Sequence, residues 1–331
     1  MLPKKKIGES SLIASVIGFG TWGIGGKTKG ATSYGQTCDK TSLDALFAAY
    51  YEGINLYDTA PAYGEGHSEI LLSKLLKDKE RDSIIIATKG GFESFQQPSD
   101  FSIEGLLKSL EGSLRRLNTS YIDLFQLHNP DNTLLKNSEQ FHMITEKLFE
   151  NGKIKALGLS VANPTDAQVA LENLPIDSIQ LNFNLLDQRA LELGLLETAK
   201  NKNISVITRT PLCFGFLTGA LKNDQLFSKD DHRSRWSKEQ INVWVDGSRA
   251  MISDLASLHN NTPSQVALRF CLSFPAITHT IPGMISDTEV LENKTAGELG
   301  PLTESELANI QILYRKQEFF LTTRPERPNA S

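Results

Sequence analysis

Four polar residues of complementary chemistry each follow a short apolar run of this sequence. Asp58 ends the run Ile54–Tyr57, and Tyr63 lies five residues further on, inside a loop. Lys89 and His128 each close a later Ile- and Leu-rich run. Such runs are typical of buried strands, and parallel strands bring their carboxyl ends to one edge of a sheet. We therefore expect the four side chains to meet in one pocket.

This set of side chains suits proton transfer to an oxygen atom. Free tyrosine, with a pKa of about 10, holds its proton too tightly to be an effective acid at neutral pH. A lysine ammonium nearby favours release of that proton, a carboxylate keeps the lysine charged, and a histidine orients a carbonyl oxygen. Lys89, Asp58 and His128 would take these parts around Tyr63. The chemistry suits carbonyl reduction, in which a hydride reaches carbon while a proton reaches oxygen.

The individual residues also have plain structural interpretations. Asp58 alone could cap a strand end with a turn hydrogen bond, and Tyr63 alone could be a packed loop aromatic. His128 alone is more often a structural histidine, whereas an unpaired lysine such as Lys89 is seldom buried. Their joint order along the chain favours the catalytic interpretation. The remaining histidines, expected on surfaces or at helix ends, are His67, His142, His232, His259 and His279.

The elements that must position these residues alternate along the whole chain. The expected strands are 16–19, 54–57, 83–87, 122–126, 156–159, 178–181, 205–207 and 278–281, after a polar hairpin over 4–15. The expected helices are 41–52, 68–76, 103–116, 138–151, 165–173, 187–201 and a pair within 248–274. Eight strands in this order predict a (β/α)8 TIM barrel, formed as a single domain over residues 1–331. Long loops at its C-terminal face, 21–40, 90–102 and 208–246, are expected to hold substrate and cofactor.

Bulk composition narrows the class of protein. The 331 residues are 40% hydrophobic and 22% charged, with a formal net charge of −5, which is ordinary globular composition. That charge, without a basic block longer than Lys4–Lys6, argues against nucleic acid or an anionic membrane as partner. The three scattered cysteines, Cys38, Cys213 and Cys271, fit neither a disulfide framework nor a zinc site. With no signal peptide and no long apolar window, a cytoplasmic protein is expected, and no metal site is predicted.

The motifs resemble, in order and over nearly the whole chain, those of the aldo-keto reductases. The matching pieces are Ile17–Trp22, Asp58–Gly64, Ala87–Lys89, Leu127–His128, Gly158–Ser160, Pro211–Leu212, Gly215–Gly219, Ile281–Gly283 and Glu292–Asn293. The resemblance implies an eight-stranded α/β barrel that binds an extended nicotinamide dinucleotide without a Rossmann motif. It also implies that Asp58, Tyr63, Lys89 and His128 form the catalytic tetrad, with Tyr63 as general acid.

The same resemblance implies the cofactor contacts. Gly20, Thr21 and Trp22 would line the nicotinamide, Ser160 and Gln180 would hold its carboxamide, and Arg209 stands where the family often stacks an aromatic. Residues 211–217 would cover the pyrophosphate, and residues 281–283 and 289–293 would surround the adenosine. The full expected set is Gly20, Thr21, Trp22, Asp58, Ser160, Gln180, Arg209, Thr210, Pro211, Leu212, Gly215, Leu217, Ile281, Pro282, Gly283, Glu289, Glu292 and Asn293. Substrate contacts are expected from Trp22, Tyr63, Phe92, His128 and Asn129.

Two departures from the family pattern concern the cofactor. Many members follow the serine with asparagine, whereas Val161 and Ala162 follow Ser160 here. NADP-preferring members usually place a lysine or arginine around the adenosine ribose, where this chain has Gly283, Ile285 and Glu289, with only Lys294 nearby. A 2′-phosphate is best held by arginine or lysine. The missing cation weakens the usual family bias toward NADPH. We still expect NADPH, with loop lysines such as Lys222 as compensating cations, and NADH is possible.

The sequence favours an NAD(P)H-dependent oxidoreductase that reduces an aldehyde or ketone, a keto-sugar included, to an alcohol. An alternative is a cofactor-binding regulatory subunit of a larger, channel-type assembly, since some relatives of this family have that role. A metal-dependent barrel hydrolase would need ligands such as His-x-His at the end of the first strand, where Gly18–Gly20 stands instead. The physiological substrate, the direction of reaction and the oligomeric state are not determined by the sequence.

Overall fold

A computed structural model describes residues 1–30, 32–150 and 152–321 of the chain. Three sequence-based expectations extend outside these residues. Position 31 belongs to the expected loop 21–40, Asn151 was expected to end a helix, and residues 322–331 close the expected domain 1–331.

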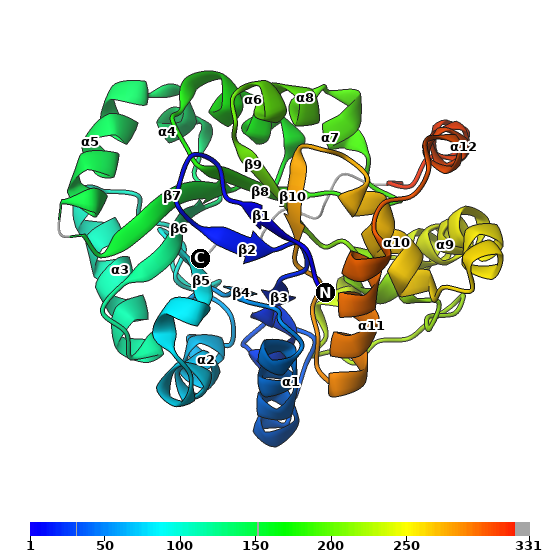
Figure 1. The fold of residues 1–331 in the computed structure, drawn as a ribbon, viewed down its shortest axis with the longest axis horizontal. Coiled ribbons are helices and arrows are strands. Elements are labelled where there is room, and N and C mark those ends of the chain that lie inside the picture. Colours follow the sequence, from blue (N-terminus) through cyan, green and yellow to red (C-terminus); the bar gives the residue numbers. More distant parts are fainter. Residues whose placement is uncertain (31, 151, 322–331) are drawn as a thin grey trace.

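Eight parallel strands follow one another around a barrel in the order of the chain (Figure 1). They are β3 (Phe19–Gly20), β4 (Leu56–Asp58), β5 (Ile85–Gly90), β6 (Ile122–His128), β7 (Ile154–Ser160), β8 (Ser178–Asn182), β9 (Ser205–Arg209) and β10 (Ile277–Thr280). Parallel bridges Ile17–Thr280 and Gly20–Gly283 join the first strand to the last, which closes the sheet. The expected (β/α)8 barrel is confirmed.

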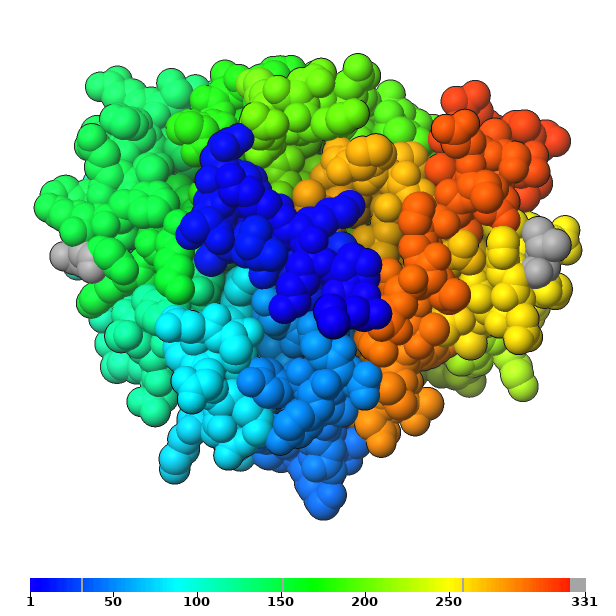
Figure 2. All heavy atoms as spheres, in the orientation of Figure 1, coloured from blue at the N-terminus to red at the C-terminus, as the bar shows by residue number. Residues whose placement is uncertain are grey.

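The N-terminal hairpin fills the end of the barrel at which the strands begin. Its strands β1 (Lys4–Lys6) and β2 (Ile13–Ser15) pair antiparallel, as the sequence predicted. Ile7, Leu12 and Ala14 share one apolar cluster with barrel residues that include Leu56 and Leu124. In Figure 2 the hairpin, in dark blue, lies across the centre of this face. The active site must therefore open at the other end.

Helices surround the sheet and bury their apolar faces against it (Figure 1). They are α1 (Asp39–Tyr51), α2 (His67–Asp78), α3 (Ile103–Leu117), α4 (Asn132–Lys136), α5 (Ser138–Phe149), α6 (Pro164–Asn173), α7 (Arg189–Glu192), α8 (Leu195–Asn201), α9 (Lys238–His259), α10 (Pro263–Leu272), α11 (Asp287–Leu299) and α12 (Glu304–Arg315). Within the described ranges, no helix is both long and apolar enough to cross a bilayer.

Several predicted boundaries were wrong. The helix expected over 187–201 is divided into α7 and α8 at Gly194, whose φ of +68° leaves the helical region. Helix α9 begins at Lys238, ten residues before the predicted start, because the Ser237 side chain accepts from the Gln240 N–H. Helices α11 and α12 were not predicted, although Thr303 and Glu306 form a capping box at the start of α12.

His279 was expected at a surface, but β10 places it in the core with no exposed area. Burial lowers the pKa of His279 to about 4. The hydrogen bond between Nδ1 and the Ser15 carbonyl oxygen, 3.1 Å apart, raises the pKa but by less than burial lowers it. A carbonyl can only accept, so Nδ1 carries the proton of a neutral ring. His279 is thus neutral in the folded state at pH values where an unfolded histidine is charged.

This burial predicts acid-sensitive folding. The stability from neutral His279 is fully present above pH 6.5 and declines as the pH falls to about 4. The loss amounts to roughly 3 kcal/mol in the free energy of unfolding. Urea unfolding at pH 7 and pH 4 should show a weaker pH dependence for His279→Asn, whose amide can still donate to Ser15. The exposed His142→Asn is the control, and equal pH dependence of the two variants would contradict the assignment.

Candidate active site

The four expected catalytic residues converge at the carboxyl ends of three neighbouring strands. Asp58 ends β4, Lys89 lies in β5, and His128 ends β6. Tyr63 reaches the same place from the loop after β4 and is half-buried. Asp58, Lys89 and His128 are 2%, 0% and 5% exposed. The barrel therefore assembles the group that the sequence predicted.

Lys89 uses all three of its N–H donors within this group. Its Nζ lies 2.5 Å from Asp58 Oδ1, 2.9 Å from the Thr59 carbonyl oxygen and 3.2 Å from the Tyr63 hydroxyl oxygen. Burial alone would lower the pKa of Lys89, but the charge of Asp58 and the neighbouring Tyr63 hold it above its usual value. The ammonium therefore stays charged. Since Tyr63 accepts from it, the phenol's own proton is free to be donated elsewhere.

Aromatic rings lie close to Tyr63 and to its neighbour His128. The ring of His128 lies edge-on to Tyr63 with 6.3 Å between centroids, and Phe92 packs edge-on to His128 at 5.3 Å. Trp22 lies on another side of Tyr63 at 6.4 Å. Asn129 follows His128 with a φ of +54°, and its buried Oδ1 finds no hydrogen-bond partner among the described residues. All five expected substrate residues thus lie at the tetrad or next to it along the chain.

A further pair of side chains, Gln126 and Gln180, holds the second oxygen of Asp58. Gln180 Nε2 lies 2.6 Å from Asp58 Oδ2, and Gln126 Nε2 lies 3.2 Å from the same atom. The sequence assigned Gln180 to the cofactor and did not single out Gln126. A signal for Gln126 existed, because it precedes His128 by two residues on one strand and so shares its face.

The expected carboxamide contacts form a continuous hydrogen-bond chain beside the tetrad. Ser160 Oγ donates to Gln180 Oε1 at 3.2 Å, and Arg209 Nη1 donates to Ser160 Oγ at 3.2 Å. Arg209 is also held by Asn182 Oδ1, 2.9 Å from its Nε. These polar groups, from three consecutive strands, offer both donors and acceptors to an amide. They fit the carboxamide of a nicotinamide.

The backbone at the barrel seam is closely packed around Gly20. Its N–H donates to the Pro282 carbonyl at 2.9 Å, and a Cβ at Gly20 would lie 2.8 Å from the Ile281 carbonyl oxygen. A side chain there would push the two strands apart, so glycine is required. Thr21 is fully buried and donates to the Asp58 carbonyl at 2.9 Å. Thr21, next to the seam, thus holds the backbone of Asp58, while Lys89, Gln126 and Gln180 hold its side chain.

The loop after β9 has an unusual backbone. Thr210, Cys213 and Phe214 have φ between +44° and +56°, and Gly215 has +93°. Left-handed conformations of non-glycine residues cost energy and gather at ligand-binding loops. Pro211 and Leu217 are buried beneath this loop, while Leu212 and Gly215 are partly exposed. The geometry fits the expected cover over a pyrophosphate.

The loop after β9 is joined to the loop after β3 at the barrel mouth. The His232 backbone N–H donates to the Ser33 carbonyl at 2.8 Å, and Lys27 pairs with Asp230 at 2.9 Å. The His232 ring lies 4.6 Å from the Trp22 ring, with its side chain 10% exposed. His232 is the first residue of the 3-10 helix His232–Arg235, so it lies at a helix end, one of the two expected places, although its ring is largely covered. Together the two loops form one wall beside Tyr63.

The expected adenosine end carries a carboxylate near the strand β10. Glu289 Oε2 accepts from the Ile285 N–H at 2.7 Å, and burial raises the pKa of Glu289. Asn293 is buried, and the Glu292 carbonyl accepts from Gln265 at 3.4 Å. Lys294 pairs with Glu298 at 2.9 Å and Glu52 at 3.5 Å. Lys294, the cation that follows Asn293 in the sequence, is thus already paired with two carboxylates.

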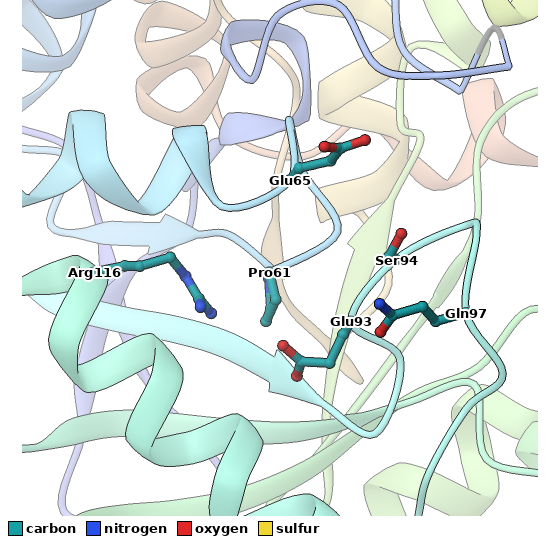
Figure 3. A pocket seen from close by; sticks show the side chains of 6 residues that line it. All are labelled: Pro61, Glu65, Glu93, Ser94, Gln97 and Arg116. Atoms are coloured by element: carbon teal, nitrogen blue, oxygen red, sulfur yellow. The ribbon is translucent and has the colours of Figure 1, made fainter.

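A small surface pocket lies beside the loop that carries Tyr63 (Figure 3). Glu93 and Arg116 point toward the space beside Pro61. Arg116 is held from behind by the buried Glu69, 2.6 Å from its Nε. The lining residues are Pro61, Glu65, Glu93, Ser94, Gln97 and Arg116. None of the four tetrad residues is among them, so this pocket is separate from the proton-transfer group.

Comparison with known proteins gives a consistent family. The model of the Aldo/keto reductase family matches residues 16–315. The aldo-keto reductase YhdN of Bacillus subtilis is 33% identical over 275 residues, 81% of each chain. An NADH-specific methylglyoxal reductase of Escherichia coli is 27% identical over 309 residues, 89% of this chain and 93% of that protein.

A solved structure agrees with these relatives in fold. The glycerol dehydrogenase of Gluconobacter oxydans superposes with a TM-score of 0.77 and 29% identity, covering 97% of this chain and 98% of that one. The family implies NAD(P)H-dependent reduction of a small carbonyl compound. The assembled tetrad, the closed barrel and these matches lead to one conclusion: the chain belongs to the aldo/keto reductase family.

Proposed function

We propose that this protein reduces an aldehyde or ketone to an alcohol, with Tyr63 as the proton donor. The observation that carries the proposal is the bond from Lys89 Nζ to the Tyr63 oxygen, 3.2 Å long, with Asp58 behind the lysine. A bound nicotinamide dinucleotide would supply the hydride. The assembled tetrad favours this enzyme over the alternative of a cofactor-binding regulatory subunit.

The residues of this chain would do three things for the reaction. Lys89 keeps its positive charge against the Tyr63 oxygen, which eases departure of the phenolic proton toward the substrate oxygen. His128, buried beside Tyr63, would orient that oxygen. Phe92 and Trp22 would exclude water from the reacting atoms, which strengthens the electrostatic effect of Lys89.

The substrate class we propose is a small oxygenated carbonyl compound, keto-sugars included. Asn129, directly after His128 in the chain, is a partly exposed residue whose amide would bind a substrate hydroxyl. Two relatives are named for glycerol and for methylglyoxal, both small oxygenated molecules. The aromatic wall around Tyr63 would contact the carbon skeleton, and the amide of Asn129 would contact a hydroxyl.

For the cofactor we propose that NADPH and NADH are both accepted. The family resemblance supports NADPH. Glu289 and the paired Lys294 support NADH, because a carboxylate accepts from ribose hydroxyls and repels a 2′-phosphate. An NADH-specific relative of 27% identity is consistent with this second preference within the family.

Tyr63→Phe tests the proton donor. The variant keeps the ring that packs on Trp22 and His128 but lacks the transferable proton, so kcat should fall by about 10²-fold or more. Affinity for NADPH, measured by fluorescence titration, should be unchanged. Turnover close to the wild type would refute Tyr63 as the acid, and failure of both proteins to bind either dinucleotide would refute the reductase.

Glu289→Gln tests the adenosine end. Glutamine can still accept from the Ile285 N–H but has no charge to repel a phosphate, so the ratio of NADPH to NADH affinity should rise about tenfold. The exposed Glu304→Gln on α12 removes the same charge elsewhere and is the matched control. An unchanged ratio in Glu289→Gln would place the adenosine away from this residue.

A further inference from the structure

The interior of the barrel just below the tetrad is polar, and its residues lie in register. Across four neighbouring strands, Lys89 pairs with Gln126, Gln126 with Gly158, and Gly158 with Ser178. Gln126 has no exposed area, so its amide must find hydrogen-bond partners inside the barrel. A fully buried amide at this position is stable only if its oxygen and nitrogen are both hydrogen-bonded.

Gly158 makes the room that Gln126 occupies. A Cβ at Gly158 would lie 2.3 Å from Ser178 Oγ and 3.3 Å from Gln126 Cγ. Two polar side chains therefore fill the space that a larger residue on β7 would take. The packing holds the Gln126 chain between β5 and β7, close to Asp58.

Hydrogen bonds at both ends fix the orientation of the Gln126 amide. Gln180 Nε2 donates to Gln126 Oε1 at 3.3 Å, which identifies the oxygen end. The opposite end, Nε2, then donates to Asp58 Oδ2 at 3.2 Å. Asp58 thus receives Lys89 on one oxygen and two amides on the other.

We propose that Gln126 is a positioning residue for the proton donor, acting on Tyr63 through Asp58 and Lys89. The inference rests on the proposed role of Tyr63 in carbonyl reduction. Gln126 hydrogen-bonds to Asp58 and Gln180, and its effect on Tyr63 passes along Asp58 and Lys89.

The physical basis is the sharing of one negative charge. Two amide donors on Oδ2 take part of the Asp58 charge, so Lys89 is less neutralised and keeps more positive potential for Tyr63. Without Gln126, Asp58 binds Lys89 more strongly and the carboxylate can rotate. The phenolic proton of Tyr63 would therefore leave less readily in the absence of Gln126.

The charged and titratable groups that face Tyr63 are Asp58 from β4, Lys89 from β5 and His128 from β6.

Gln126→Leu in the full-length protein tests this inference. With methylglyoxal and saturating NADPH, kcat should fall about tenfold, and the alkaline limb of its pH profile should move to higher pH. The dissociation constant of NADPH should be unchanged. Should leucine prevent folding, Gln126→Met offers an unbranched apolar chain of similar length. If the alkaline limb of kcat stays at its wild-type pH, the proposal is overturned even when kcat itself has fallen. A merely structural loss lowers kcat without shifting the pH profile.

Two controls isolate the route through Asp58. Ser178→Ala removes a hydroxyl from the same interior layer, and that hydroxyl has no hydrogen-bond partner in the described part of the chain. Its pH profile should match the wild type. In an Asp58→Asn background, adding Gln126→Leu should change kcat no further. An additional loss there would show that Gln126 acts by another route and would overturn the proposal.

A measurement without turnover separates this inference from the proposed function. Tyrosine labelled with 13C at Cζ reports ionisation of each phenol, and Tyr63→Phe assigns the Tyr63 resonance. Gln126→Leu should move its transition to higher pH even if no carbonyl is reduced. A shifted transition in a protein without turnover would retain the positioning role and refute the reductase. An unshifted transition in an active reductase would refute the positioning role.

Discussion

The buried ion pair between Lys89 and Asp58 is the interaction on which the site depends. Removing two charges from water costs several kcal/mol each, so such a pair persists only where further hydrogen bonds satisfy it. Here Lys89 donates to Asp58, Thr59 and Tyr63, and Asp58 accepts from Lys89, Gln126 and Gln180. The pair is therefore held by partners from the loop after β4 and from the strands β6 and β8. One of those partners is the phenol proposed to do the chemistry.

The rest of the fold positions this ion pair and keeps water away from it. Parallel strands in chain order bring Asp58, Lys89 and His128 side by side. The hairpin fills the opposite end of the barrel with Ile7, Leu12 and Ala14, which keeps water from the interior below the pair. The two joined loops, linked through Ser33 and His232, stand beside Tyr63 at the open end. Low dielectric around the pair makes its electrostatic effect on Tyr63 large.

Sequence reasoning succeeded where a local pattern of residues is enough to determine the structure. The apolar runs before Asp58, Lys89 and His128 predicted buried parallel strands, and eight such runs predicted a closed barrel. It failed where a single residue overrides a periodic pattern, as Gly194 does between α7 and α8. It also failed for His279, because a lone histidine carries no local sign of burial. Its burial depends on the position of β10 in the barrel and on the hairpin, whose Ser15 carbonyl accepts from its Nδ1.

By itself, the sequence determined the alternation of strands and helices, the four polar strand ends and the motif order of the aldo/keto reductase family. These follow from periodicity and residue type, which are local properties of a chain. The tertiary structure alone decided that Gln126 reaches Asp58, that Gln180 serves Asp58 as well as Ser160, and that Lys294 is already paired. Each of these depends on strand register or on distances between residues far apart in the chain. Such distances are set only when the barrel closes.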